Sequence, residues 1–199
     1  MARLALNKSS MAKQSNKLKL YKEVLPALDM KRQQLLIAQA KARAELAELL
    51  KKEAELNELV GAEVPMLSNK KIDLTNVVAV DDFEILEENV VGTKIPKAGK
   101  LKLTVGMYSY LSKPHWVDYA AKLLIQSIEI QLQLMVVKKR VKLLDKAALT
   151  YTQRFNLFDK VLIPKTRENI KKIKIYLSDS ERAQLVNAKI AKKKKGVLV

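Results

Sequence analysis

Two long stretches of the chain repeat apolar residues at alternating steps of three and four, and the stretch between them does not. The first runs from Leu18 to Val60 and the second from Trp116 to Leu162. Such steps place an apolar stripe along one side of a helix, the pattern of a coiled coil. Neither helix is stable alone in water, so each stripe must cover the other.

The predicted fold class is therefore mostly α: a long antiparallel two-helix coiled coil with a small α/β lobe, containing a short β-hairpin, at the turn end. We expect the antiparallel arrangement because the connection has the composition of a compact lobe. The predicted division is 1–60 for the N-terminal helix, 61–115 for the lobe and 116–199 for the C-terminal helix with a frayed basic tail.

The first stripe is more often interrupted by polar residues than the second. Its polar members are Arg32, Gln39 and Glu53, whereas Ser127 alone interrupts the second. Pro26 predicts a kink or local break in the first helix, because proline removes a donor and crowds the preceding turn. The apolar members of the first stripe are Leu18, Tyr21, Leu25, Leu28, Leu35, Ala42, Leu46, Leu49, Leu56 and Val60. Those of the second are Trp116, Ala120, Leu123, Ile130, Leu134, Val137, Val141, Leu144, Ala148, Tyr151, Phe155, Phe158 and Leu162.

The second stripe loses its phase after Leu162, close to Pro164. It resumes at Ile170, Ile173 and Leu177 with Thr166 between, an added four-residue step. Such a stutter locally relaxes a left-handed supercoil. Farther on, Ser178 and Glu181 have the spacing of a capping box, so a short separate helix is expected to begin there.

The stretch 61–115 has a different composition. Val77–Val80, Asn89–Val91 and Leu101–Val105 are β-favouring runs, separated by glycines and prolines at 65, 92, 96, 99 and 106. All five glycines of the chain fall outside the predicted helices. One or two β-hairpins and a short helix fit this pattern best.

The formal net charge of +17 is unevenly spread. Residues 1–34 carry +6 and residues 160–199 carry +9, whereas residues 60–99 carry −3. An antiparallel helical pair brings both ends of the chain together, so we expect a basic tip opposite an acidic or neutral lobe. A basic balance of this size indicates nucleic acid or another anionic surface as a possible partner.

The sequence contains no arrangement of residues that matches a catalytic, cofactor-binding or metal-binding motif. Gly92 and Gly99 are too far apart for a phosphate-binding loop, and His115, the one histidine, is better explained as the start of the second helix. The carboxylates at 81, 82, 84, 87 and 88 lack the spacing of a calcium loop and predict a solvated or docking face. There is no cysteine, no signal peptide is apparent, and no segment approaches the ~18 apolar residues of a membrane span. We therefore predict a non-enzymatic protein with no cofactor.

Two basic or aromatic features have competing interpretations. Lys192–Lys195 could contact phosphates, form a solvated basic terminus or contact an acidic protein rim. Tyr151, Phe155 and Phe158 could form a stacking platform, but their coiled-coil spacing favours a core.

Three segments are similar to a known family. Arg154-Phe155-Asn156-Leu157-Phe158, followed by Val161-Leu162-Ile163-Pro164, carries most of the likeness. Asn89-Val90-Val91-Gly92-Thr93-Lys94-Ile95-Pro96 and the opening segment with Asn7, Leu25 and Lys31–Leu35 add to it. The sequence resembles the D subunit of the V-type rotary ATPases.

This resemblance implies a central-stalk rotor shaft that couples ATP synthesis or hydrolysis to ion transport. Its implied partners are the catalytic and non-catalytic nucleotide-binding subunits of the headpiece, the small F subunit of the stalk and a socket subunit over the membrane ring. Neither nucleic acid nor direct membrane insertion is expected, and the location would be cytoplasmic, peripheral to the membrane. The implied shaft residues are Arg154, Phe155, Asn156, Phe158, Leu162 and Pro164, and those of the lobe are Gly92, Lys94 and Pro96. The slip near Pro164 would bend the shaft.

Two other interpretations fit part of the pattern. A basic RNA- or ribosome-associated coiled coil explains the charge, and its binding would fall steeply with salt. A static scaffold shares the coil but would not associate with a nucleotide-hydrolysing hexamer.

Overall fold

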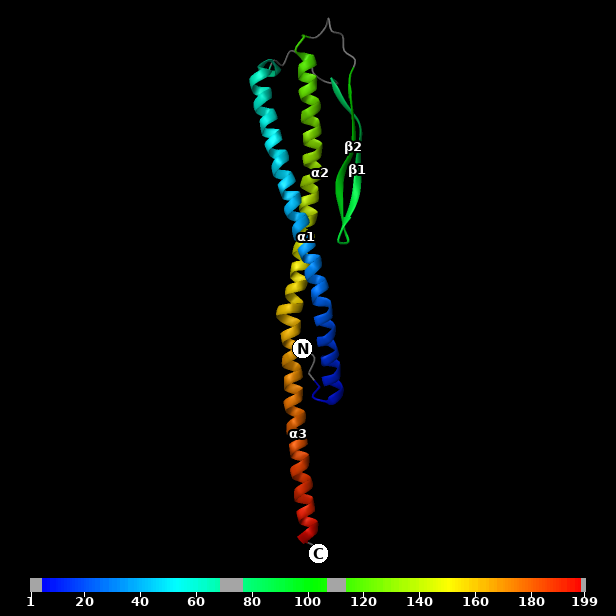
Figure 1. The fold of residues 1–199 in the computed structure, drawn as a ribbon, viewed down its shortest axis with the longest axis vertical. Coiled ribbons are helices and arrows are strands. Elements are labelled where there is room, and N and C mark those ends of the chain that lie inside the picture. The colour runs from blue at the N-terminus through cyan, green and yellow to red at the C-terminus, as the bar shows by residue number, and fades with distance from the viewer. Residues whose placement is uncertain (1–4, 69–76, 107–113, 198–199) are drawn as a thin grey trace. The chain divides into compact units, whose positions relative to one another are not determined.

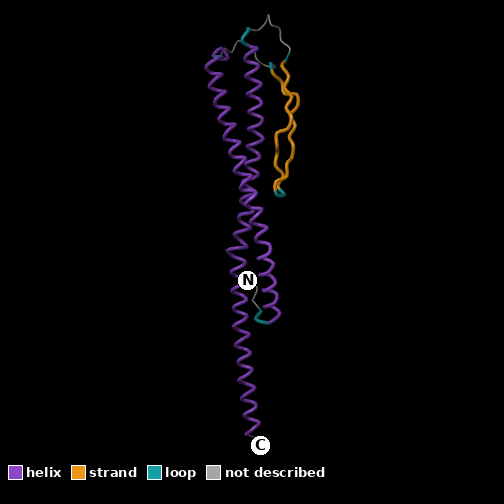
Figure 2. The backbone as a smooth tube through the Cα atoms, viewed as in Figure 1, coloured by secondary structure: helices purple, strands orange, loops and turns teal. Residues whose placement is uncertain are grey.

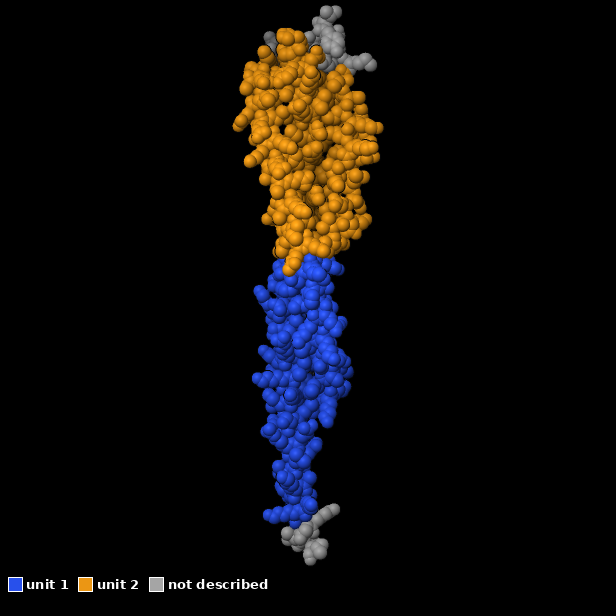
Figure 3. Space-filling model, viewed as in Figure 1, with its two compact units in different colours: residues 1–32, 150–199 blue, residues 33–149 orange. Residues whose placement is uncertain are grey.

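The computed structural model describes residues 5–68, 77–106 and 114–197. The chain divides into two compact units, coloured separately in Figure 3. Unit 1 contains residues 1–32 and 150–199, and unit 2 contains residues 33–149. Residues 69–76 and 107–113 of the predicted lobe lie outside the described residues.

Helices make up most of the described residues (Figures 1 and 2). Helix α1 spans Lys8–Glu63, α2 spans Val117–Asn156 and α3 spans Ile163–Val197. A π-helix, η2, spans Leu157–Leu162, and a short 3-10 helix, η1, spans Pro65–Ser68. The side chain of Asn7 caps α1, because its Oδ1 accepts a hydrogen bond of 2.7 Å from the Ser10 N–H.

In unit 1 the first part of α1 packs antiparallel against the end of α2, η2 and α3. Lys8 lies 3.9 Å from Glu181, and Tyr21 packs against Phe158 farther along. The buried centre on α3 consists of Ile163, Thr166 and Ile173. Beyond Glu181, α3 continues without cover from α1, and its residues to Lys194 are exposed.

In unit 2 the rest of α1 packs antiparallel against α2. Arg43 and Asp145 form an ion pair of 3.0 Å at one level, and Tyr119 donates a hydrogen bond to Glu63 at another. The buried residues of the seam are Leu35, Ala42, Leu49, Ala120, Leu123, Leu134, Val137, Val141, Leu144 and Ala148. The predicted antiparallel coil with a β-hairpin is thus confirmed.

The hairpin of unit 2 consists of β1, Val78–Val90, and β2, Thr93–Val105. Its register shifts at Asp81 and again at Glu84. Gly99 faces Glu84 at the second shift, and a Cβ at residue 99 would lie 2.9 Å from the Glu84 carbonyl oxygen. The close approach of the strands therefore requires glycine there. The strands run through the acidic residues between the predicted β runs, and pairing resumes after each register shift.

The structure corrects four predictions on helix ends and breaks. Helix α1 continues through Pro26, which lies on its exposed side. Gly61 lies in α1 and Gly196 in α3, so not all glycines fall outside helices. No separate helix begins at Ser178, and residues 192–195 are helical instead of frayed. The i→i+4 hydrogen bonds of a long helix carry it past single unfavourable residues.

One helical stretch within Val117–Lys194 is long and apolar enough to cross a membrane by length and composition. This finding corrects the expectation that no segment approaches a membrane span. Core helices of soluble proteins meet the same criterion, so it is a weak sign of a membrane span. One third of the apolar window is buried inside the structure.

Candidate functional site

The six predicted shaft residues lie along one continuous segment of unit 1. Arg154, Phe155 and Asn156 form the last turn of α2, Phe158 and Leu162 lie in η2, and Pro164 is the second residue of α3. The structure therefore brings them together at the change from α to π geometry.

Two aromatic side chains of this segment anchor it to α1. The Arg32 guanidinium lies 4.2 Å from the centroid of the Phe155 ring, and Asp29 holds the same guanidinium at 2.6 Å. Phe158 meets Tyr21 edge to face with ring centroids 5.4 Å apart. Such contacts are worth about 0.5–1.5 kcal/mol each. The aromatic residues thus serve as core, and Arg32, a polar interruption of the first stripe, acquires a partner.

The structure places a π turn at the predicted phase slip. Ile163 is 6% exposed, whereas the predicted Leu162 is only half-buried. Of the other side chains here, Thr166 and Ile173 are buried, and Phe155, Phe158, Ile170 and Leu177 are half-buried like Leu162. The step from Phe158 to the buried Ile163 is five residues, one more than the predicted step to Leu162. The Ile163 N–H donates to the Phe158 carbonyl across that step, so the structure has a π turn, which takes up one extra residue, directly before Pro164.

Pro164 and Thr166 explain why the wide turn lies here. Proline has no N–H, and in an α-helix its ring would crowd the carbonyl of Lys160. The wider π turn relieves that crowding at Pro164, where a backbone hydrogen bond is lost in any case because proline has no N–H. The buried Thr166 hydroxyl donates to the Leu162 carbonyl at 2.6 Å, which satisfies both groups.

The three predicted lobe residues lie in the hairpin of unit 2. Gly92 occupies the turn with a φ of 82°. Lys94 forms an ion pair of 3.2 Å with Glu87 on the opposite strand, and Pro96 is buried. Gly92 and Lys94 shape the hairpin itself, whereas Pro96 contacts the coil.

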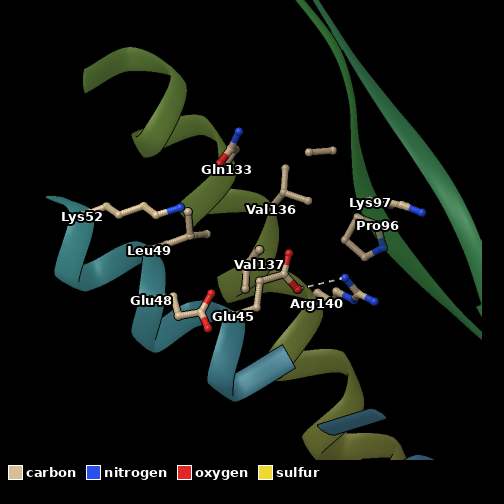
Figure 4. A pocket seen from close by; sticks show the side chains of 11 residues that line it. Glu45, Glu48, Leu49, Lys52, Pro96, Lys97, Gln133, Val136, Val137 and Arg140 are labelled. Atoms are coloured by element: carbon tan, nitrogen blue, oxygen red, sulfur yellow. Dashed lines mark hydrogen bonds and ion pairs between the residues drawn. The ribbon is translucent and has the colours of Figure 1, made fainter. Parts of the chain in front are cut away.

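Arg140 joins the hairpin to both helices of unit 2. From α2 its guanidinium lies 3.2 Å from Glu45 of α1 and 3.9 Å from Glu88 of β1. Figure 4 shows it beside a pocket of about 350 Å³ that α1, α2 and β2 line together. Pro96, Val136 and Val137 are apolar members of that lining. The hairpin thus covers one flank of the coil through an apolar contact and an ionic one.

The opposite flank of unit 2 has no such cover among the described residues. Steps of four and three from Leu36 lead to Ala40, Arg43, Ala47 and Leu50. Steps of three and four from Met135 lead to Lys138, Lys142, Asp145 and Leu149. The ion pair between Arg43 and Asp145 shows that both rows face the same side. We call the exposed apolar set the lateral face: Leu36, Ala40, Ala47 and Leu50 of α1 with Met135 and Leu149 of α2. Met135 is 69% and Leu149 61% exposed, so the lateral face offers large apolar side chains to solvent.

Charge is divided sharply between the units. Unit 1 contains 21 basic and six acidic residues, a balance of +15, and unit 2 contains 17 and 15, a balance of +2. The predicted acidic face on β1 is largely paired, since Asp81 accepts from Thr104 and Glu87 and Glu88 face Lys94 and Arg140. Among the described residues, no group of three or more His, Asp or Glu side chains is placed to hold a metal ion.

Sequence reasoning missed several contacts between the elements. Arg140, Glu45 and Asp145 lie at flanking positions of the coil, where charged residues are common and no single one is distinctive. Gln39 is a polar interruption of the first apolar stripe in the sequence. In the structure its side-chain amide donates a hydrogen bond to the Asp145 carboxylate on the other helix. The hydrogen bond from Tyr119 to Glu63, with some desolvation and the charge of Glu63, raises the pKa of Tyr119 above its usual 10.0.

Comparison with known proteins gives a consistent result. The family described as the D subunit of ATP synthase matches residues 10–193. A V-type ATP synthase D subunit from Borreliella burgdorferi is 32% identical over 96% of this chain and 95% of its own length. Those of Chlamydia muridarum and Chlamydia pneumoniae are 28% and 30% identical over 97% and 95% of this chain, and 96% and 91% of their own.

Proposed function

The chain belongs to the ATP synthase D-subunit family and is a central-stalk subunit of a V-type rotary ATPase, and we propose that it works there as a non-catalytic rotor shaft. It would contribute no catalytic group and would transmit torque between ATP chemistry in the headpiece and ion transport in the membrane. The complex places it peripheral to the membrane, on the cytoplasmic side in this proposal.

The observation that carries the proposal is the charge of +15 on the coil of unit 1. Catalytic and non-catalytic nucleotide-binding subunits would surround this coil. A basic shaft attracts acidic loops of those subunits without a fixed register, which suits a part that must turn past each in succession. The bare end of α3, with Lys189 and Lys192–Lys194 exposed, would lie deepest among them.

The lateral face supports a second partner. Its apolar side chains and alanines leave room for the close approach of another helix. We assign this face to the small F subunit of the stalk, and the turn end of unit 2 to the socket subunit over the membrane ring.

Purification of the tagged chain from its native membranes tests the main proposal. Recovery of the nucleotide-binding subunits with ATPase activity is the expected result. Recovery of ribosomal material would favour the RNA-associated alternative, which the family membership does not favour. Recovery of a complex without any nucleotide-hydrolysing hexamer would favour the static scaffold.

Leu50→Glu tests the lateral face. Burial of a leucine side chain contributes about 1.5–3 kcal/mol, so the affinity for the F subunit should fall at least about tenfold. Lys51→Glu, at the neighbouring exposed position outside the face, is the matched control and should leave the affinity within a few fold. Equal effects of both variants in a titration followed by calorimetry would remove the assignment.

A further inference from the structure

The apolar stripes of α1 and α2 allow more than one register in unit 2. Both stripes repeat every seven residues, and on α2 the stripe is apolar at every step from Ile130 to Phe155. A slide of one helix by seven residues, about 10 Å along the axis, therefore again brings apolar residues together. The stripes by themselves do not select the observed register, so other contacts between the helices have to select it.

A polar group at the seam makes this selection. Gln39 interrupts the α1 stripe between the buried Leu35 and Ala42. Its side-chain amide donates a hydrogen bond to the carboxylate of Asp145, which is half-buried on α2. Arg43 donates to the same carboxylate oxygen at 3.0 Å. The carboxylate thus receives donors from two consecutive turns of one helix, and these donors fix its level along α1.

A slide by seven residues in either direction removes these contacts. In one direction Lys138 takes the place of Asp145, so that a second cation faces Arg43. In the other direction Thr152 takes that place and brings no charge. The first slide replaces an attraction by a repulsion, and the second leaves the guanidinium without its carboxylate.

From these contacts we infer that Gln39, Arg43 and Asp145 form a register lock, which selects one of the registers that the apolar stripes permit. Polar groups at a seam specify register at a cost in stability. The ion pair between Glu45 and Arg140, 3.2 Å apart, fits the same register. Arg43 and Asp145 belong to the two rows of the lateral face, so the lock also sets which side chains of these rows lie side by side. The inference concerns the chain itself and does not depend on the proposed rotor function.

Arg43→Asp tests the lock in the full chain. The variant places two carboxylates together in the observed register, whereas a slide of seven residues pairs the introduced carboxylate with Lys138. Spin labels on cysteines that replace the exposed Lys41 and Lys122 report the register, and the chain has no other cysteine. Pulsed electron paramagnetic resonance should show a new distance peak, shorter than the original by up to about 10 Å.

A reversed pair and a control complete this test. Asp145→Arg, added to Arg43→Asp, restores an ion pair and should bring back the single original peak, because the Gln39 amide can accept a hydrogen bond as well as donate one. Lys51→Asp makes the same change of charge at an exposed position of α1 and should leave the peak unchanged. The inference is overturned when Arg43→Asp retains only the original peak, or when the reversed pair does not restore that peak.

Gln39→Leu combined with Asp145→Leu separates the choice of register from stability, and it also serves if Arg43→Asp does not fold. Leucine continues the apolar surface, so the melting temperature should not fall. The distance distribution should nevertheless gain at least one displaced peak. One sharp peak at the original distance, with or without a lower melting temperature, would show that the polar group does not select the register and would remove the inference.

Discussion

At the scale of the residue, the hairpin turn holds an unusual backbone conformation. Val90 pairs with Thr93, so Val91 and Gly92 form a two-residue loop, with φ values of 54° and 82°. Loops of this length with positive φ at both positions match the twist of the strands, and they favour Asn-Gly. Valine is branched at Cβ and is a strained choice there.

Val91→Asn should therefore stabilise the chain. Relief of a left-handed conformation is worth about 1–2 kcal/mol, and we expect a gain near the lower limit because Val91 is half-buried and its apolar contacts are lost. Urea unfolding monitored by circular dichroism measures it. Gly92→Ala, which places a side chain at the second positive φ, should have the opposite sign, and a loss of stability in both variants would contradict the assigned turn.

At the scale of the element, one arginine decides how the hairpin is held. A two-stranded hairpin is marginally stable alone in water, so β1 and β2 need the coil beneath them. Ile95 and Pro96 supply the apolar part of that contact, and Arg140 the ionic part. Arg140 is 22% exposed on its side chain, less than the pair formed by Arg43 and Asp145.

Arg140→Ala should loosen the hairpin more than the coil. Glu45 loses a hydrogen bond and Glu88 an ionic contact of 3.9 Å, at side chains that are 47% and 43% exposed. We expect this loss to cost about 1–2 kcal/mol after allowance for solvent screening. Hydrogen exchange should show faster amides in residues 78–105, with little change in the buried part of α2. Arg43→Ala, in the more exposed pair on the other flank, should cost less than about 1 kcal/mol and leave the hairpin amides unchanged. Similar exchange profiles for the two variants would argue against Arg140 as the link.

At the scale of the whole molecule, the distribution of charge and the continuity of the helices matter more for the proposed function than any single site. Nearly all of the net charge belongs to unit 1, and the same unit contains the one π turn of the described residues. If the chain turns inside a ring of subunits, the stiffness of this unit determines how tightly ATP chemistry is coupled to ion transport.

Pro164→Ala should alter that coupling. Alanine supplies the missing N–H and removes the crowding against the Lys160 carbonyl, so the wide turn is no longer held in one place. We expect a changed number of ions pumped per ATP hydrolysed in reconstituted vesicles. Pro26→Ala is the matched control, since α1 passes through Pro26 without a break. Unchanged pumping per ATP in the Pro164 variant would count against a role of this turn in coupling.

The sequence by itself determined the helices and which of their sides are covered. Every predicted apolar member of the two stripes, from Leu18 to Val60 and from Trp116 to Leu162, is buried or half-buried in the structure. This success has a local cause, because the period of an α-helix is set by its own backbone. The division into 1–60, 61–115 and 116–199 stays a prediction.

Only the tertiary structure decided the features that depend on two elements at once. The burial of Ile163 beside the half-buried Leu162 goes with the π turn η2, whose neighbours Phe158 and Phe155 pack on Tyr21 and Arg32 of α1. The partners of Arg140 come from α1 and β1, far away in the sequence. A repeat of three and four shows which side of a helix is covered. It does not show which of several neighbouring charged residues forms an ion pair, or where one extra residue is inserted, because both depend on the elements that pack against the helix.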